Sequence, residues 1–336
     1  MDTQGLIDVV PQPIENSVEV SPDLSPIAKA VIGVFTTKTE INHDPKISVN
    51  RFVSEIASWY EKLRNVMEIQ DEGVILKNAI KRILKRRMML GGTGNNIAEP
   101  LLRELVWARY FPDESLPQNL VTKTTHIINL YLALKHKILE LHRFKDSTLN
   151  EWMLDLMSCE ISRMLAPNKE KEAMSNFMYH ILKERILIED DAEDTKNVQV
   201  YLAIRRAFAK DDLSFLRYHL FSQIFPPLTN ESIESIARVF VKGFKEMERQ
   251  LHYRLKEKIY LYVKRQTPIF IILDDVLREY KKDALKLISD PIAFEATVME
   301  DCERRYKEIS SKVRRAIIRS VIFLILTKVF FAFAIE

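Results

Sequence analysis

Glycine and cysteine are both scarce in this sequence, with only 7 and 2 residues respectively among 336. Sheets built from hairpins use glycine repeatedly in their turns, so its scarcity argues against a strand-rich fold. Leucine, isoleucine, lysine, glutamate and arginine are abundant instead, a composition typical of helices. Cys159 and Cys302 lie far apart and lack a zinc-ligand spacing. They predict neither a disulfide framework nor a metal site, and no cofactor is expected.

Two further features are missing. The N-terminal stretch MDTQGLIDVVPQP has no basic or apolar segment, so no secretory signal peptide is predicted. A strong overall charge is also lacking, because the formal net charge is only +3. Residues 301–336 carry 8 Lys+Arg and 4 Asp+Glu, so all of the net positive charge comes from them. The near-neutral remainder argues against a globally basic nucleic-acid-binding protein.

Apolar residues recur at steps of three and four along most of the chain, without sustained alternation. This periodicity predicts an all-α fold, a multi-helix bundle or array followed by a C-terminal transmembrane helix. A flexible tail is expected over 1–26 and a helical body over 27–300, with a possible boundary near 189–196. Residues 301–336 are expected to form a basic helix that continues into a membrane segment.

Apolar periodicity, proline positions and capping residues locate the individual helices. The expected ranges are 27–35, 49–67, 74–90, 101–111, 117–144, 149–165, 169–188, 198–209, 211–225, 229–265, 268–288 and 291 onward. The GGTGNN segment at 91–96 lacks the Lys-Ser/Thr pair of a phosphate-binding loop and follows a helix. It therefore predicts a helix C-cap and turn.

Lys328 is the only charged residue in the otherwise apolar run Ser320–Ile335. A helix needs about 20 apolar residues to cross a hydrocarbon core of about 30 Å. Counting from Ala316 reaches that length if Arg319 extends back to the head groups. The run predicts a transmembrane segment in which Lys328 faces a partner helix or aqueous cavity of a longer membrane protein. A buried C-terminal helix is the alternative.

Two basic segments are candidates for contact with anionic lipid. The first precedes the apolar run, and such a flank is expected to keep the helical body in the cytoplasm. It contains Arg304, Arg305, Lys307, Lys312, Arg314, Arg315 and Arg319. The second is one face of the helix expected over 74–90. It contains Lys77, Lys81, Arg82, Lys85, Arg86 and Arg87. For this face, a solvated or acid-paired surface is the alternative.

An acidic cluster suggests an enzyme as a different interpretation. A DDxxD pattern, similar to the magnesium-binding motif of helical prenyl-diphosphate synthases, is formed by Asp190, Asp191 and Asp194. A second half-site for the metal would come from Asp274 and Asp275. Arg278 stands where that second motif would have an aspartate, and the first cluster lies in a polar connector. A solvated acidic loop is therefore the favoured interpretation.

These patterns together favour a membrane-localised helical scaffold, adaptor or regulatory domain on the cytoplasmic side, forming the N-terminal part of a longer membrane protein. Its expected partners are anionic lipid and a protein that the sequence does not identify. One alternative is a magnesium-dependent enzyme acting on isoprenoid or lipid diphosphates. Another is RNA or DNA binding by the 77–87 face, which would depend steeply on salt.

Overall fold

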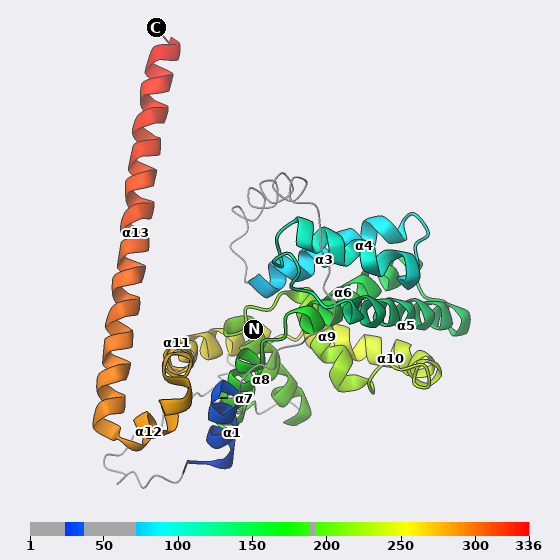
Figure 1. Ribbon diagram of the computed structural model, residues 1–336, viewed down its shortest axis with the longest axis horizontal. Coiled ribbons are helices and arrows are strands. Elements are labelled where there is room, and N and C mark those ends of the chain that lie inside the picture. The colour runs from blue at the N-terminus through cyan, green and yellow to red at the C-terminus, as the bar shows by residue number, and fades with distance from the viewer. Residues whose placement is uncertain (1–23, 37–71, 189–192, 336) are drawn as a thin grey trace, which may run out of the picture. The chain divides into compact units, whose positions relative to one another are not determined.

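The computed structural model describes residues 24–36, 72–188 and 193–335. Within these ranges every regular element is a helix, which confirms the all-α prediction (Figure 1). The chain divides into two compact units at Thr267 and Pro268. The first unit contains described residues 72–188 and 193–267, and the second contains 24–36 and 268–335. The predicted tail up to residue 23, the predicted helix over 49–67 and residues 189–192 of the predicted boundary near 189–196 lie outside the described residues.

The first unit is built from consecutive helices joined by short connections. They are α3 (Glu72–Met88), α4 (Gly94–Trp107), α5 (Asn119–Leu141), α6 (Asp146–Leu165), α7 (Lys169–Leu182), α8 (Glu193–Ala207), α9 (Leu213–Ile224), α10 (Ile233–Leu251) and the first part of α11 (Lys256–Tyr280). The GGTGNN segment forms the predicted turn: Gly91 has a φ of 77°, and Thr93 and Asn96 cap α4 reciprocally. Because of this cap, α4 begins already at Gly94 and includes Pro100.

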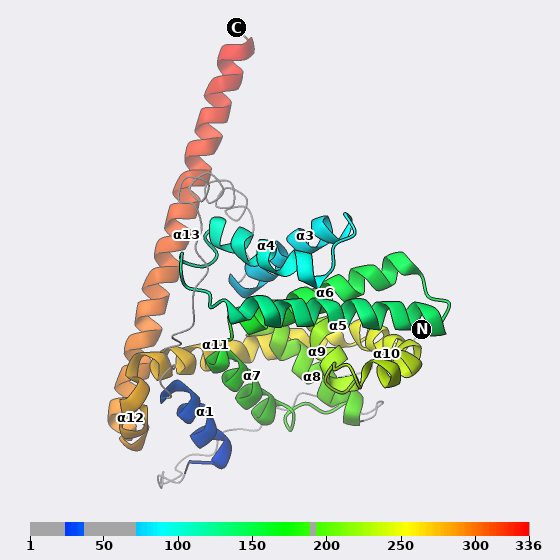
Figure 2. The same cartoon turned by 45° about the vertical axis from the view of Figure 1, so that its right-hand side comes forward.

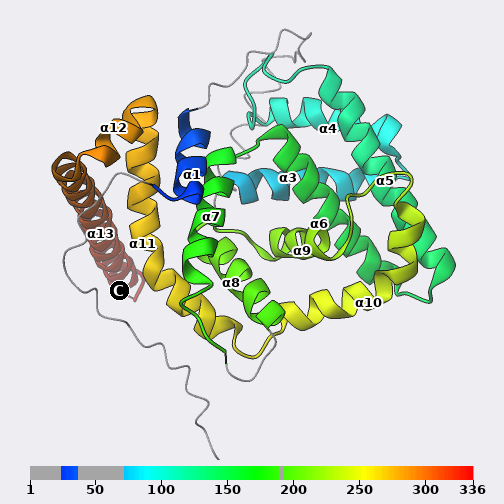
Figure 3. The same cartoon turned by 90° about the horizontal axis from the view of Figure 1, so that it is seen from below.

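Helix α6 is the centre of this unit, and it packs against α3, α5 and α9 (Figure 3). Its sequence EWMLDLMSCEISRML carries apolar or small residues on every side, so it has no fully polar face to present to solvent. Trp152, Met157 and Ile161 are at most 2% exposed. Helix α6 is therefore a buried core helix.

An aromatic cluster holds α9 and α10 together next to α6. The Phe225 ring stacks on Phe240, with centroids 5.9 Å apart, and Phe244 lies 5.0 Å from Trp152. Gly243 of α10 lies directly under the Phe225 ring. A β-carbon at this position would come within 2.3 Å of Cζ of Phe225. The glycine that interrupts the helical pattern is thus required by close packing.

Replacing Gly243 by alanine should destabilise the protein. Alanine favours a helix interior by about 0.5–1 kcal/mol, but overpacking a filled core costs about 1–3 kcal/mol. We expect the midpoint of urea unfolding to fall. Gly33→Ala is the matched control, because a β-carbon on this helical glycine would have no atom within 4 Å, and the substitution should leave the midpoint unchanged or raise it. Equal effects of the two substitutions would contradict this account.

The second unit contains α1 (Pro26–Thr36), the second part of α11, the 3-10 helix η1 (Lys281–Asp283), α12 (Ala284–Ser289) and α13 (Pro291–Ile335). Helix α1 contacts η1, and its Phe35 ring lies 5.4 Å from the guanidinium of Arg278. The predictions for α1 and for the start of α13 are confirmed. Asp290 caps α13 by accepting hydrogen bonds from the backbone N–H groups of Ile292 and Ala293, both at 3.1 Å.

Several helix boundaries differ from the prediction, and the largest differences besides the start of α4 concern α10 and α11. The helix expected over 229–265 is broken at 252–255, although no glycine or proline lies there. Tyr253 is only 8% exposed, and burying its ring turns the chain between α10 and α11. The predicted helix start at Pro268 is also wrong, because Pro268 lies inside α11. The apolar face around it, with Val263 and Phe270 buried, keeps the helix continuous despite the missing N–H group.

Candidate functional site

The basic face of α3 turns toward α6 and is neutralised by acidic side chains. Lys77 is 1% exposed and forms an ion pair with Asp212. Lys81 lies 2.6 Å from carboxylate oxygens of both Glu151 and Asp155. Farther along, Arg86 and Arg87 both contact Glu104, Lys85 lies 4.0 Å from Glu151, and Arg82 is half-buried. The arrangement matches the acid-paired alternative, so predicted phosphate or lipid contact by this face gains no support.

Asp155 is a buried carboxylate of the first unit with three side-chain donors. It accepts hydrogen bonds of 2.6 Å from Lys81, Ser214 and Arg217 while being 1% exposed. Burial alone would raise the pKa of this carboxyl, but the bonds from Lys81 and Ser214 and the Lys81 charge outweigh it, so the pKa is lowered. The ionised Asp155 therefore joins α3, α6 and α9 through charge-assisted hydrogen bonds.

A second buried network of hydrogen bonds joins α8 and α9. Asp211 accepts hydrogen bonds from Arg205 at 2.6 Å and from Nε2 of His219 at 3.1 Å, and Nδ1 of His219 lies 3.2 Å from the Tyr201 hydroxyl. Desolvation is the main effect on His219 and lowers its pKa, so the ring is neutral. A neutral ring that donates to Asp211 accepts the Tyr201 proton at Nδ1. This hydrogen-bond network orients all four side chains. Burial also raises the pKa of Tyr201, which disfavours the ionised tyrosinate form.

The acidic residues of the predicted magnesium motif do not form a site that the structure describes. Asp190 and Asp191 lie outside the described residues, and Asp194 is exposed in the first turn of α8. Asp274 pairs with Arg278 at 2.8 Å, and Asp275 pairs with Arg305. Asp194 belongs to the first unit, whereas Asp274 and Asp275 belong to the second. No group of three or more His, Cys, Asp or Glu side chains among the described residues could hold a metal ion.

Helix α13 is the long C-terminal helix of the second unit (Figure 2), and its sequence is basic in its middle and apolar toward its end. Arg304 contacts Glu279 at 3.1 Å and also pairs with Asp301, while Lys307 lies 3.3 Å from Glu303. The next basic side chains are all exposed and have no carboxylate partner in the described part of the chain. We call them the collar, which consists of Lys312, Arg314, Arg315 and Arg319.

Beyond the collar, large apolar side chains are exposed on every side of the helix. The exposed residues, between 47% and 69% accessible, are Val321, Ile322, Phe323, Leu324, Ile325, Leu326, Val329, Phe330 and Phe331. We call these residues the apolar tip. The Thr327 hydroxyl donates to the backbone carbonyl of Phe323 at 2.6 Å, so this polar group is satisfied within the helix. Lys328 is the only charged residue between the first and last residues of the tip, and it is exposed.

The described part of the chain contains no helix with both the length and the apolar character needed to cross a membrane. The predicted transmembrane helix over 316–335 is therefore not supported, and Arg319 and Lys328 are the two charges that interrupt its apolar run.

No protein family, curated protein or solved structure matches this chain. The described residues define a two-unit helical protein. Its first unit has an apolar core crossed by buried ion pairs, and its second carries a long helix with an exposed apolar end.

Proposed function

We propose that this protein is a membrane-attached helical scaffold or regulatory module whose α13 embeds its apolar tip in a bilayer containing anionic lipid. The proposal rests on the order of two surfaces along α13, the collar followed by the apolar tip. Four exposed cations without acidic partners among the described residues are followed at once by apolar side chains around the whole circumference. A lipid surface matches both parts, because head groups are anionic and acyl chains are apolar.

The energetics favour lipid over water for this segment. Moving one large apolar side chain out of water contributes about 1.5–3 kcal/mol. Several such side chains outweigh the cost of about 2.5–3.5 kcal/mol for a lysine at the centre of an inserted helix. Lys328 can lower that cost further by extending its ammonium group toward the head groups. The internal hydrogen bond of Thr327 leaves no unsatisfied hydroxyl to transfer.

The collar also sets the orientation in this proposal. Basic residues next to a membrane segment are retained on the cytoplasmic side, so the helical body would lie there. Within that body, the main charged groups join neighbouring helices: Asp155 and Asp211 each bind several donors from other elements. These carboxylates are occupied by donors of the same chain, which supports a structural role for them over a magnesium-dependent reaction.

Replacing three tip residues by asparagine should test the attachment. For Ile322→Asn, Leu326→Asn and Phe330→Asn combined, we expect co-flotation with phosphatidylcholine–phosphatidylserine vesicles to fall at least about 100-fold, since each residue loses roughly 1 kcal/mol or more of apolar transfer. The matched control changes Met89, Leu187 and Val239 to asparagine, three exposed apolar residues outside α13. It should float like the unchanged protein.

Two outcomes would overturn the proposal. One is a full-length protein that never floats with vesicles but forms oligomers dependent on the tip, which would identify a second copy of the chain as the occupant. The other is flotation that the tip substitutions and the control substitutions reduce equally.

A further inference from the structure

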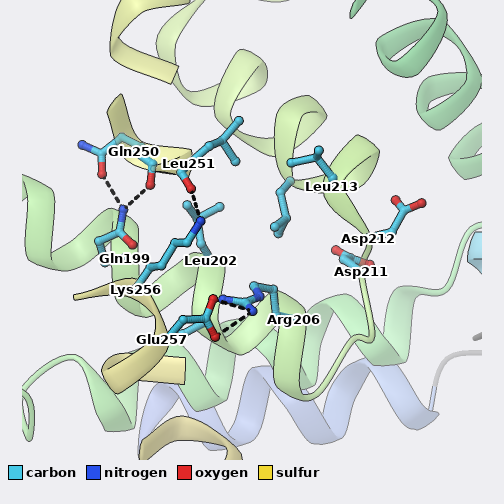
Figure 4. Close-up of a pocket in the computed structure, with 12 residues that line it drawn as sticks. Gln199, Leu202, Arg206, Asp211, Asp212, Leu213, Gln250, Leu251, Lys256 and Glu257 are labelled. Carbon is cyan, nitrogen blue, oxygen red and sulfur yellow. Dashed lines mark hydrogen bonds and ion pairs between the residues drawn. The ribbon is translucent and has the colours of Figure 1, made fainter. Parts of the chain in front are cut away.

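A cavity of about 330 Å³ lies in the first unit, next to the turn that separates α10 from α11 (Figure 4). Its walls come from α8, the start of α9, the end of α10 and the first turn of α11. The break at 252–255 creates this cavity, because it places the start of α11 beside α8. The volume is at the lower end of the range for small-molecule sites, about 300–1,000 Å³.

One side of the cavity is apolar. Leu202, Leu216 and Leu251 line it and are between 5% and 8% exposed, and Leu213 stands at its edge with 51% exposed. In Figure 4 the Leu213 side chain points into the open space between α8 and α9. This wall suits a compact hydrocarbon group.

The charged groups in the cavity are neutralised with one exception. Arg206 and Glu257 pair at 3.0 Å. Asp212 is bound by Lys77 and by the backbone N–H of Phe215, and Asp211 is bound by Arg205 and His219. Lys256 alone has no carboxylate partner among the described residues.

The Lys256 ammonium nitrogen donates to the backbone carbonyl of Leu251 at 2.7 Å (Figure 4). An ammonium group has three donors, so two remain after this bond. Gln199 next to it is held by two bonds to Gln250, at 2.9 Å to the backbone carbonyl and 2.7 Å to the side-chain oxygen. The cation is therefore held beside an ordered pair of glutamines, with two donors to spare and with Leu202 and Leu251 in the same lining.

We propose that this cavity binds a small organic acid, with its carboxylate on Lys256 and its apolar body against Leu202 and Leu216. An ammonium–carboxylate contact is a charge-assisted hydrogen bond, about twice as strong as a neutral one. The leucines supply the apolar contact that a free inorganic anion would lack. This site lies wholly within the first unit and does not depend on membrane attachment.

Three probes of the same size and different charge test the proposal by calorimetry on the full-length protein. They are phenylacetate, the neutral phenylacetamide and the cationic phenethylamine. Phenylacetate should bind with a Kd on the order of 1 mM or lower and at least about tenfold more tightly than the other two. Equal or tighter binding of phenethylamine would overturn the proposal.

Lys256→Met, which removes the ammonium group and keeps an unbranched apolar side chain, should weaken phenylacetate binding at least about tenfold without changing the response to phenylacetamide. Lys258→Met is the matched control, because Lys258 is exposed on the same helix and does not line the cavity. Lys256→Arg should keep the preference for the acid, and it separates loss of charge from loss of the bond to Leu251. Unchanged phenylacetate binding by a folded Lys256→Met variant would refute the site.

Discussion

Replacing Asp155 by alanine is expected to lower the free energy of unfolding by about 3–5 kcal/mol, the usual cost of removing one partner of a buried ion pair. Asp155 is 1% exposed and binds Lys81, Ser214 and Arg217. Without the carboxylate, the Arg217 guanidinium would lose its acceptor in a partly desolvated site, and the Lys81 ammonium would keep only Glu151. The Arg217 guanidinium also lies 4.6 Å from the centre of the Trp152 ring, and keeping it there without the carboxylate would cost free energy.

Glu151→Ala is the matched control for this measurement. Glu151 binds the same Lys81 nitrogen at the same distance of 2.6 Å, but its side chain is 45% exposed. An exposed pair contributes at most about 1 kcal/mol, so this substitution should change stability little. Urea unfolding of both variants checks the prediction. Similar losses for the two would show that burial does not determine the strength of the Lys81 pairs.

The dependence of stability on pH follows from the same carboxylate. Its pKa in the folded protein lies below the value of about 3.9 in the unfolded chain. The stabilisation from ionised Asp155 is therefore fully present above about pH 4 and is lost as the pH falls through the folded pKa. The stability difference between the wild type and the Asp155→Asn variant should accordingly shrink on acidification.

Helix positions could be predicted wherever local chemistry fixes an end. Asp212 caps α9 by accepting a hydrogen bond from Phe215, Pro291 opens α13, and both ends were predictable from residue type. The break after α10 was not, because no local residue demands it. It depends on the burial of Tyr253 and on the bond from Lys256 to Leu251, which are tertiary effects.

The charged sites were less predictable than the helices. Periodicity correctly places Lys77 and Lys81 on one helical face, but it does not reveal that α6 and α9 supply carboxylates opposite them. One signal was present in the sequence. Asp155 interrupts the apolar run WMLDLM, and a charge at such a position must find partners when the helix is buried.

The cavity beside Lys256 could not be predicted at all, because it exists only through the unforeseen break. Its lining combines residues from four helices, with Leu202, Leu216 and Lys256 as examples. None of these residues belongs to a sequence motif. Sites assembled in this way become visible only when the helices are placed together.

Neutralising the collar should weaken attachment to anionic membranes by about 1,000-fold. The variant changes Lys312, Arg314, Arg315 and Arg319 together to glutamine. Each basic residue near an anionic surface contributes about 1 kcal/mol, and these four have no acidic partner in the described residues that would already offset their charge. Vesicle flotation with and without phosphatidylserine measures the effect.

The lipid dependence separates the collar from the tip. Binding to pure phosphatidylcholine should be nearly unchanged by the collar substitutions, because the apolar tip remains intact. Raising the salt from about 0.1 M to 1 M shortens the screening length from about 10 Å to about 3 Å. The wild type should then approach the collar variant in its binding to anionic vesicles.

The control must remove the same charge elsewhere on the protein. Lys242, Lys245, Lys258 and Lys264 are exposed outside α13, and changing all four to glutamine alters the net charge equally. If the collar acts by its position beside the tip, this control keeps most of its affinity for anionic vesicles. If both variants lose affinity to the same extent, attachment follows overall charge, and α13 has no special part in it.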